Sequence, residues 1–507
     1  MALNDIIFNK GQGGLGRPLA GEDYISGLIF YAADGYLPSG FSSNDRIKLV
    51  GSVQDAENLG ILNDYSDGSS ATFTLVFEDT GSTGDTVRID YTNVDSSITT
   101  LANYTVQSSD TTIALQGQAI TDAINGGTYV HGFSATFDGT DTILVTIPKS
   151  QGYYPSDNSP VYIYETGDIA FILAQPSGGT PSKFAVWHYH IAEYFRIQPK
   201  GSLYIGFFEF QMGNTFVEIQ TMQVYSGGKI RQIGIYKDGS FYVGDLTTIQ
   251  TVLNNLDGDH MPVSSVLYAG DLQGIGDLTT LPDLNPLTAP KVSAVISQDG
   301  AGQGAFLYKT NFKSITTLGA TLGAVSLASV SEDIAWPVKF NISNGAECDT
   351  IAFANGVLAS TVSKNNQETL DNRRYIFLLK YVGLAGSYFN DSHTAVAVNS
   401  DYAYIENNRT IDKAIRNVYA AMIAYINSPL VLNTDGTLSD TTVAFFESLA
   451  NTSLDEMVRA TELSGKSVVI DPTQNVLSTG NITITVKLLP VGVARQITVN
   501  IGFTTSL

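Results

Sequence analysis

Short apolar runs alternate with helical patterns on both sides of one polar block, and this arrangement most strongly limits how the chain can fold. The block, residues 66–153, is rich in Ser, Thr, Asp and Gly. Strands that alternate with helices favour βα units around a layered sheet. The sequence therefore predicts a mixed α/β, multi-domain protein in which the polar block is a domain inserted into a discontinuous α/β domain.

The segments that flank the block supply the strands and helices of this α/β domain. Residues 46–50 form an apolar run that leads to Ser52, an N-cap residue, and then to a helical pattern over residues 53–59. We expect residues 21–65 and 154–363 to form the discontinuous middle domain. Beyond the block, it draws on strand patterns at residues 161–164, 202–208, 233–236 and 292–296 and on helical patterns near residues 246–256 and 316–330.

Within the block, period-2 alternation between Gly and Asp clusters is typical of β-strands. Such alternation occurs at residues 72–77, 86–91 and 143–147. One helical pattern, residues 113–124, interrupts these runs and ends at Gly126. Residues 66–150 hold ten acidic and two basic side chains, a net charge of −8. We therefore expect a separate acidic, β-rich domain.

The overall charge excludes several classes of partner. The 507 residues carry a formal net charge of −22, with 15% charged residues. Binding to nucleic acid or to anionic lipid is therefore not expected.

The single cysteine, Cys348, excludes disulfides and thiolate cages within one chain. The start resembles no secretory signal, and no run of about 18 apolar residues predicts a membrane span. We expect no membrane insertion.

Two glycine-containing motifs resemble phosphate-binding loops but lack the required context. The stretch from Gly11 to Gly16 matches the dinucleotide fingerprint, yet Arg17 and Pro18 follow where a helix should begin. We interpret it as a flexible hinge. The turn at residues 464–467 follows a helical pattern rather than a strand, so a phosphate cradle is not expected there.

The best metal candidate is His188 with His190 and Glu193. On a strand, the i, i+2 spacing would place both imidazoles on one face. The aromatic residues around them favour a core or an interface instead. No Gly-x-Ser-x-Gly elbow or hydrolase triad is present. Paired carboxylates cannot be assessed from spacing along the chain. We expect no catalytic residue, no metal and no cofactor.

The last third has the most regular helical pattern. A helix is predicted over residues 411–426 with one buried apolar stripe, formed by Ile411, Ile415, Val418, Met422 and Ile426. A second helix is expected at about residues 440–463. Two closing strands are expected at residues 482–488 and 496–501.

Charge is distributed unevenly along the chain. Residues 364–507 have a net charge of −2, so residues 1–363 carry −20. Arg409, Lys413 and Arg416 share one helix face by their i, i+4, i+7 spacing. They form either a solvated helix face or a basic ridge that docks on an acidic partner.

The C-terminal third resembles the sheath proteins of contractile phage tails and related injection machines. The stretches that carry the resemblance are residues 381–383, 388–394, 401–416 and 489–503, with weaker agreement at 319–336 and 354–356. Together they cover most of residues 160–507. The inserted block resembles only the variable, outward-facing insertions of such sheaths.

This resemblance implies a separate role for each domain of the chain. An N-terminal arm, residues 1–20, and a C-terminal arm strand, residues 489–507, would pair with neighbouring subunits. Residues 364–488 would form a domain that faces an inner tube, and residues 66–153 would point outward. The arm contacts would come from Ile6, Ile7, Phe8, Ile497, Val499 and Ile501, the hinge from Gly11, Gly13, Gly14 and Gly16, and the tube contacts from Arg409, Lys413 and Arg416.

The resemblance also implies a function and partners. The chain would be a homo-oligomeric protomer that polymerises helically around an inner tail tube protein and contracts to drive the tube through a target cell envelope. A baseplate and a tail terminator protein would be further partners. The location would be a virion tail or phage-tail-like particle, assembled in the bacterial cytoplasm. The alternative is an acidic, β-rich surface or carbohydrate-binding protein, with the inserted block as its binding module.

Overall fold

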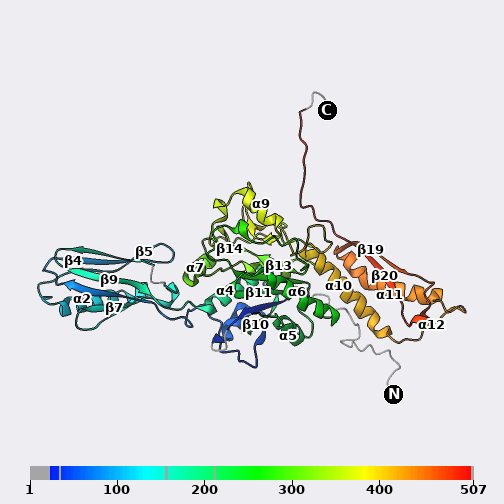
Figure 1. Cartoon of the computed structure of the whole chain (residues 1–507), viewed down its shortest axis with the longest axis horizontal. Helices are drawn as coiled ribbons and strands as arrows, with labels where there is room; N and C mark the ends of the chain where they lie inside the picture. Colours follow the sequence, from blue (N-terminus) through cyan, green and yellow to red (C-terminus); the bar gives the residue numbers. More distant parts are fainter. Residues whose placement is uncertain (1–22, 33–35, 155–157, 211–212, 504–507) are drawn as a thin grey trace, which may run out of the picture.

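The computed structural model describes residues 23–32, 36–154, 158–210 and 213–503. Figure 1 shows three parts in a row: a β-rich domain, a central α/β domain and a smaller C-terminal unit of helices and a hairpin. The predicted mixed α/β, multi-domain fold is confirmed. None of the described helices is long and apolar enough to cross a membrane.

The central domain is built on a seven-stranded sheet. Its order is β16-β13-β12-β11-β1-β10-β2. All neighbouring pairs are parallel except β10 with the edge strand β2. The strands are β1 Ile25–Tyr31, β2 Ile47–Val50, β10 Ser202–Phe208, β11 Gln232–Ser240, β12 Ser265–Asp271, β13 Val292–Val295 and β16 Tyr375–Ile376.

Helices cover both faces of this sheet, as expected for parallel strands that are buried on two sides. On β1, Gly27 faces Met222 of α5, whereas the next residue, Leu28, lies against Gly234 on the side of α8. α5 also packs against α6, and α8 against α4. The helices are α1 Val53–Asn58, α4 Lys183–Ile197, α5 Glu218–Tyr225, α6 Val243–Gly258, α7 Gln303–Asn311, α8 Leu318–Leu327 and α9 Lys364–Asn372.

The packing of α4 against α8 depends on a glycine. A Cβ atom added to Gly319 of α8 would lie 2.1 Å from the carbonyl oxygen of His190 on α4. No real Cβ contact is that short, so the two backbones approach each other only because Gly319 has no side chain. This close approach fixes how the two helices lie on the sheet.

The inserted domain consists of two antiparallel sheets with its own hydrophobic core. One sheet has the order β6-β7-β3-β9 and the other β5-β4-β8. Helix α2 contacts strands of both. The elements are β3 Thr72–Asp79, β4 Thr86–Thr92, β5 Ile98–Thr105, α2 Ile113–Gly126, α3 Thr128–His131, β6 Ser134–Phe137, β7 Thr142–Thr146, β8 Val161–Thr166 and β9 Ala170–Ser177.

The predicted end of the insertion at residue 153 was too early. β8 pairs with β4, and β9 pairs with β3, so the insertion continues to Ser177. The strand predicted at residues 161–164 therefore belongs to the insertion and not to the middle domain. The sequence pattern marks a strand but does not identify its partner, which lies about 70 residues earlier in the chain.

Two short antiparallel ribbons extend the central domain. β14 pairs with β15, and β17 pairs with β18. The strands are β14 Ser297–Asp299, β15 Ile351–Phe353, β17 Leu378–Leu379 and β18 Tyr388–Phe389. The main hydrophobic core runs on to Ile405, so the predicted start of the C-terminal domain at residue 364 was also too early.

The C-terminal unit contains α10 Ile405–Met422, α11 Asp440–Arg459, β19 Leu463–Ile470, α12 Val476–Thr479 and β20 Ile484–Pro490. α10 packs against α11, and α11 packs against β19. β19 and β20 form a two-stranded antiparallel sheet. Its buried clusters are small, with four and three buried members. The unit therefore has little core of its own.

Candidate functional site: the anchor of the C-terminal arm

The chain leaves β20 at Pro490 and continues as an extended segment, which we call the C-terminal arm (residues 491–503). Figure 1 shows the arm running away from the body of the molecule. Ile497, Val499 and Ile501 are 79%, 69% and 91% exposed. The strand predicted at residues 496–501 is therefore not formed within the chain, since no described strand pairs with the arm. A strand needs a neighbour to complete its ladder of hydrogen bonds.

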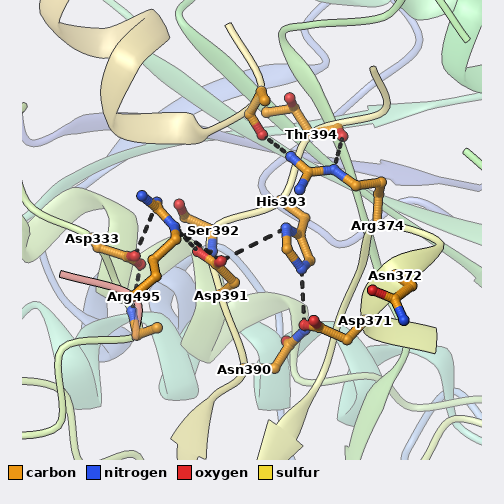
Figure 2. A network of polar contacts seen from close by, with 12 residues as sticks. Asp333, Asp371, Asn372, Arg374, Asn390, Asp391, Ser392, His393, Thr394 and Arg495 are labelled. Carbon is orange, nitrogen blue, oxygen red and sulfur yellow. Dashed lines mark hydrogen bonds and ion pairs between the residues drawn. The ribbon is translucent and has the colours of Figure 1, made fainter. Parts of the chain in front are cut away.

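Arg495 fixes the root of the arm. Its Nη2 lies 3.1 Å from an oxygen of Asp333 and 2.5 Å from an oxygen of Glu406, and its Nε lies 3.0 Å from an oxygen of Asp391. Figure 2 shows Arg495 between Asp333 and Asp391. The guanidinium also stacks 3.4 Å from the ring centre of Tyr404. One side chain thus ties the arm to three carboxylates and one aromatic ring.

Three separate segments bring these carboxylates together. Asp333 lies in the loop after α8, Asp391 follows β18, and Glu406 is in the first turn of α10. A carboxylate at a helix N-terminus also interacts favourably with the helix dipole. The anchor therefore depends on the correct packing of the central domain against α10.

The anchor holds more negative than positive charge. Three carboxylates face one guanidinium, and the side chains of Asp333 and Glu406 are 7% and 3% exposed. Burial, and then repulsion from Glu406 and Asp391, raise the pKa of Asp333 to about 8. Burial acts to lower the pKa of Arg495, but attraction to Asp391, Glu406 and Asp333 outweighs it and raises that pKa. At neutral pH Asp333 accordingly holds a proton.

A second set of contacts supports the loop that carries Asp391. His393 Nε2 lies 2.9 Å from Asp371, and its Nδ1 lies 3.9 Å from Asp391. Arg374 donates hydrogen bonds to the carbonyl oxygens of Thr394 and Ala403. Figure 2 shows His393 between the two aspartates, with Arg374 alongside. These contacts hold Asp391 in place for Arg495.

Sequence reasoning missed this site. Asp333, Asp391, Glu406 and Arg495 are far apart in the chain and form no local motif. All four lie inside the stretches that resemble sheath proteins, and this was the only signal that pointed toward them. Their convergence is visible only after folding.

The basic residues predicted to contact a tube point into the molecule. Arg409 is 2% exposed and donates to the carbonyl oxygens of Ala328, Ser329 and Asp23. Lys413 forms ion pairs with Asp23 at 2.7 Å and Glu462 at 2.6 Å. Arg416 lies 3.0 Å from Asp23. The exposed basic ridge is thus not formed in the single chain, and tube contact by these three residues stays a prediction.

The predicted stripe on α10 has the right period but is only partly buried. Ile415 is 52% exposed and Ile426, beyond the helix end, is 63% exposed. Val418 of the stripe packs against the buried cluster of α11 and β19, but the adjoining polar face of α10 is buried as well. On it, Asp412 is paired with Lys291 at 2.9 Å, next to the buried Arg409. The ion pairs of this face determine which side of the helix faces the core.

The histidine pair does not form a metal site. His188 and His190 lie on helix α4 rather than on a strand, and at i, i+2 they point to different sides. His188 Nε2 contacts Glu57 at 2.9 Å, and Glu193 pairs with Arg196 at 2.6 Å. His190 is buried among aromatic rings, and this burial lowers its pKa to about 3. Among the described residues, no group of three or more His, Cys, Asp or Glu is arranged to hold a metal ion.

The remaining predicted site residues lie outside the described residues. They are Ile6, Ile7 and Phe8 of the N-terminal arm and the hinge residues Gly11, Gly13, Gly14 and Gly16.

Two models of one protein family match this chain. The DUF2586 N-terminal domain matches residues 244–393, and the DUF2586 C-terminal domain matches residues 401–507. Together they span about half of the chain. The second match contains α10, the hairpin and the arm, and the anchor uses residues from both. No curated protein matches the chain.

Twenty-one chains of solved structures match, and they include contractile sheath proteins. The anti-feeding prophage helical sheath in the contracted state is 16% identical, with 63% of this chain and 81% of that chain covered and a TM-score of 0.45. The PVC sheath of an extracellular contractile injection system is 15% identical, with coverages of 63% and 80% and a TM-score of 0.42. The sheath tail protein of Desulfitobacterium hafniense is 11% identical, with coverages of 96% and 100% and a TM-score of 0.37.

Proposed function

We propose that this chain is the protomer of a contractile tail sheath, which polymerises helically around an inner tube and contracts to drive that tube through a cell envelope. The observation that carries the proposal is the C-terminal arm, an exposed strand-like segment anchored at its root by Arg495. Within the described chain this arm is exposed and pairs with no strand. It fits a protein that is completed by its neighbours.

The open hairpin offers a place for such an arm. Within the described residues, β19 and β20 pair only with each other, so the outer edge of each strand is free. Free strand edges accept an added strand from another chain, because its main-chain groups complete the ladder. Ile497, Val499 and Ile501 follow the period of 2 that such a strand needs to place apolar side chains on one face. A neighbouring copy supplies this strand in the proposed lattice.

The anchor gives the arm its mechanical role. A contracting lattice changes the contacts between subunits, so the subunits need tethers that persist while these contacts repack. Arg495 holds one end of the tether through three carboxylates, and strand pairing holds the other. Because head-to-tail contacts of this type need not close into a ring, they can continue into a helix.

In the proposed sheath, helix α10 lies on the surface that faces the inner tube. Its exposed side contains Ile415 and Tyr419, which are 52% and 39% exposed. The inner tail tube is the proposed partner for this face. The baseplate and the tail terminator are proposed partners at the two ends, in a virion tail or phage-tail-like particle assembled in the bacterial cytoplasm.

Electron microscopy of the purified chain tests the proposal. We expect the full chain to form helical tubes or rings. A chain truncated after Arg495 keeps the anchor but loses the strand, so it is expected to stay monomeric with an unchanged melting temperature. As a matched control, Asn500→Ser leaves the apolar alternation intact and should assemble normally. A dispersed full-length monomer that binds glycans would favour the carbohydrate-binding alternative and refute the proposal.

A further inference from the structure

A large groove lies beside the anchor, between the central domain and the root of the arm. Its volume is about 1570 Å³. Its walls come from residues 329–338, 364–371, 377–391 and 491–497. The described chain leaves it open to solvent, since Trp336 and Val338 on its wall are 46% and 86% exposed.

The groove is acidic. Five acidic side chains line it, against two basic ones. Both bases already face acids, because Arg495 belongs to the anchor and Lys364 lies 3.7 Å from Glu368. The acidic residues are Glu332, Asp333, Glu368, Asp371 and Asp391. Asp333 holds a proton at neutral pH and Glu332 is paired with Lys339, but the other three carboxylates still outnumber the two bases, so a small negative excess would favour an incoming cation.

One wall of the groove is apolar and aromatic. Tyr381 is 42% exposed and lies on the same lining as Trp336 and Val338. Large apolar side chains that remain half exposed on one surface mark an interaction site. A suitable occupant thus combines positive charge with apolar side chains.

The described chain begins next to this groove. Arg409 donates through Nη2 to the carbonyl oxygen of Asp23 at 3.3 Å and through Nη1 to that of Ser329 at 3.2 Å. Ser329 lines the groove. The carbonyl oxygen of Tyr24 also accepts a hydrogen bond of 2.8 Å from Ser326. The 22 residues before Asp23 therefore start at the rim of the groove.

Residues 8–19 of this segment, between Asp5 and Glu22, have the composition that the groove requires. From residue 8 to residue 19 the only charged side chains are the basic Lys10 and Arg17. Apolar side chains stand beside them at Phe8, Leu15 and Leu19. Arg17 is six residues from Asp23, a reach of about 20 Å in an extended chain.

We propose that residues 8–19 dock into this groove of the same chain before it assembles, with their two cations over the acidic lining and their apolar residues on the wall of Trp336 and Tyr381. While it is docked in the groove of its own chain, the N-terminal segment cannot bind neighbouring subunits. Exposed ion pairs are individually weak. A short tether nevertheless gives an effective concentration of about a millimolar, so weak contacts suffice for docking. The proposal concerns the free chain and does not depend on sheath assembly.

Disulfide crosslinking in the purified full chain tests this docking. Cys348, the only native cysteine, is buried and does not interfere. We would introduce Gly16→Cys with Val338→Cys on the groove wall. The matched control combines Gly16→Cys with Val224→Cys on α5, which is 57% exposed. The N–H of Arg231, a few residues after α5, donates to the carbonyl oxygen of Ile25, so the control site also lies near the start of the described chain.

We expect the groove pair to form an intramolecular disulfide at least tenfold faster than the control pair, at the mass of a monomer. The substitutions Lys10→Gln and Arg17→Gln, made together in the groove pair, should slow disulfide formation severalfold. The addition of 1 M salt should have the same effect, because both changes remove the attraction to the acidic lining. Equal rates for the groove and control pairs would overturn the proposal. A disulfide found only in dimers would also overturn it, since the occupant would then be a second copy.

Discussion

Replacing Asp333 by Asn should stabilise the folded chain at pH 7 to 8. Asp333 is buried in the anchor next to Glu406 and Asp391, and burial together with their repulsion raises its pKa from 3.8 to about 8. In the unfolded chain the same carboxyl group ionises near pH 4. Between these two values the folded state keeps a proton that the unfolded state has lost, so stability decreases as the pH rises toward 8. Asn carries no ionisable group and removes this loss.

The size of the effect follows from the two pKa values. Because the pKa of Asp333 is about 8 in the folded chain and 3.8 in the unfolded chain, this carboxyl group lowers the free energy of unfolding at pH 7. The loss is at most roughly 4 kcal/mol. Relaxation of the site reduces this, so we expect a gain of about 2 kcal/mol at pH 7 and none at pH 4. The NH2 group introduced by Asp333→Asn replaces the oxygen that accepts from Arg495 at 3.1 Å, which offsets part of the gain, but the amide oxygen can still accept the hydrogen bond of 2.8 Å that the N–H of Ala335 donates to Asp333. The geometry of the loop should therefore be kept.

Urea unfolding at pH 4.5, 7 and 8.5 measures this prediction. Trp336 lies three residues from Asp333 and reports on the anchor by its fluorescence. Asp391→Asn is the matched control, because it removes the carboxylate that faces Arg495 Nε with both oxygens and should destabilise the chain. The reasoning is refuted if Asp333→Asn shows the same dependence on pH as the unchanged chain, or if it lowers stability at pH 7.

Three further substitutions test other parts of the structure. Arg495→Met leaves the ionised carboxylates of Asp391 and Glu406 without their cation, so we expect a loss of about 3 kcal/mol and faster hydrogen exchange around the anchor; unchanged exchange would argue against the anchor. Gly319→Ala places a methyl group 2.1 Å from the carbonyl oxygen of His190 and should lower the melting temperature by at least several degrees; an unchanged melting temperature would contradict the close packing. Ile415→Glu changes a half-exposed residue, so calorimetry should find the monomer within about 0.5 kcal/mol of normal while microscopy finds no assembly; normal tubes would exclude this face as an interface.

The sequence was most informative where a signal is local. Ser52 caps α1 by accepting a hydrogen bond from the N–H of Asp55, as its position before a helical pattern predicted. The alternation at residues 72–77 and 86–91 correctly marked β3 and β4. These features depend on backbone preferences and on neighbours a few residues away, so they can be read from the order of the residues.

Predictions failed where the outcome depended on distant residues. A metal site at His188 and His190 would have required a strand, but the segment forms α4, whose aromatic side chains are buried against the sheet and α8, as the favoured core interpretation predicted. On α10 the period of the apolar residues was correct, yet the helix turns its polar face inward because Arg409 and Asp412 find buried partners from other elements. A helical period identifies a face but not what that face contacts.

The sequence by itself determined the α/β class, the presence of an acidic insertion and the apolar alternation of the C-terminal arm, because each depends on local periodicity and composition. Only the tertiary structure decided that Asp333, Asp391 and Glu406 meet at Arg495, and that the arm pairs with no described strand of its own chain. The physical reason is that electrostatic contacts and strand pairing depend on distance in space. The three carboxylates come within 3.1 Å of the Arg495 guanidinium only after the central sheet, the loop following β18 and the first turn of α10 have packed together.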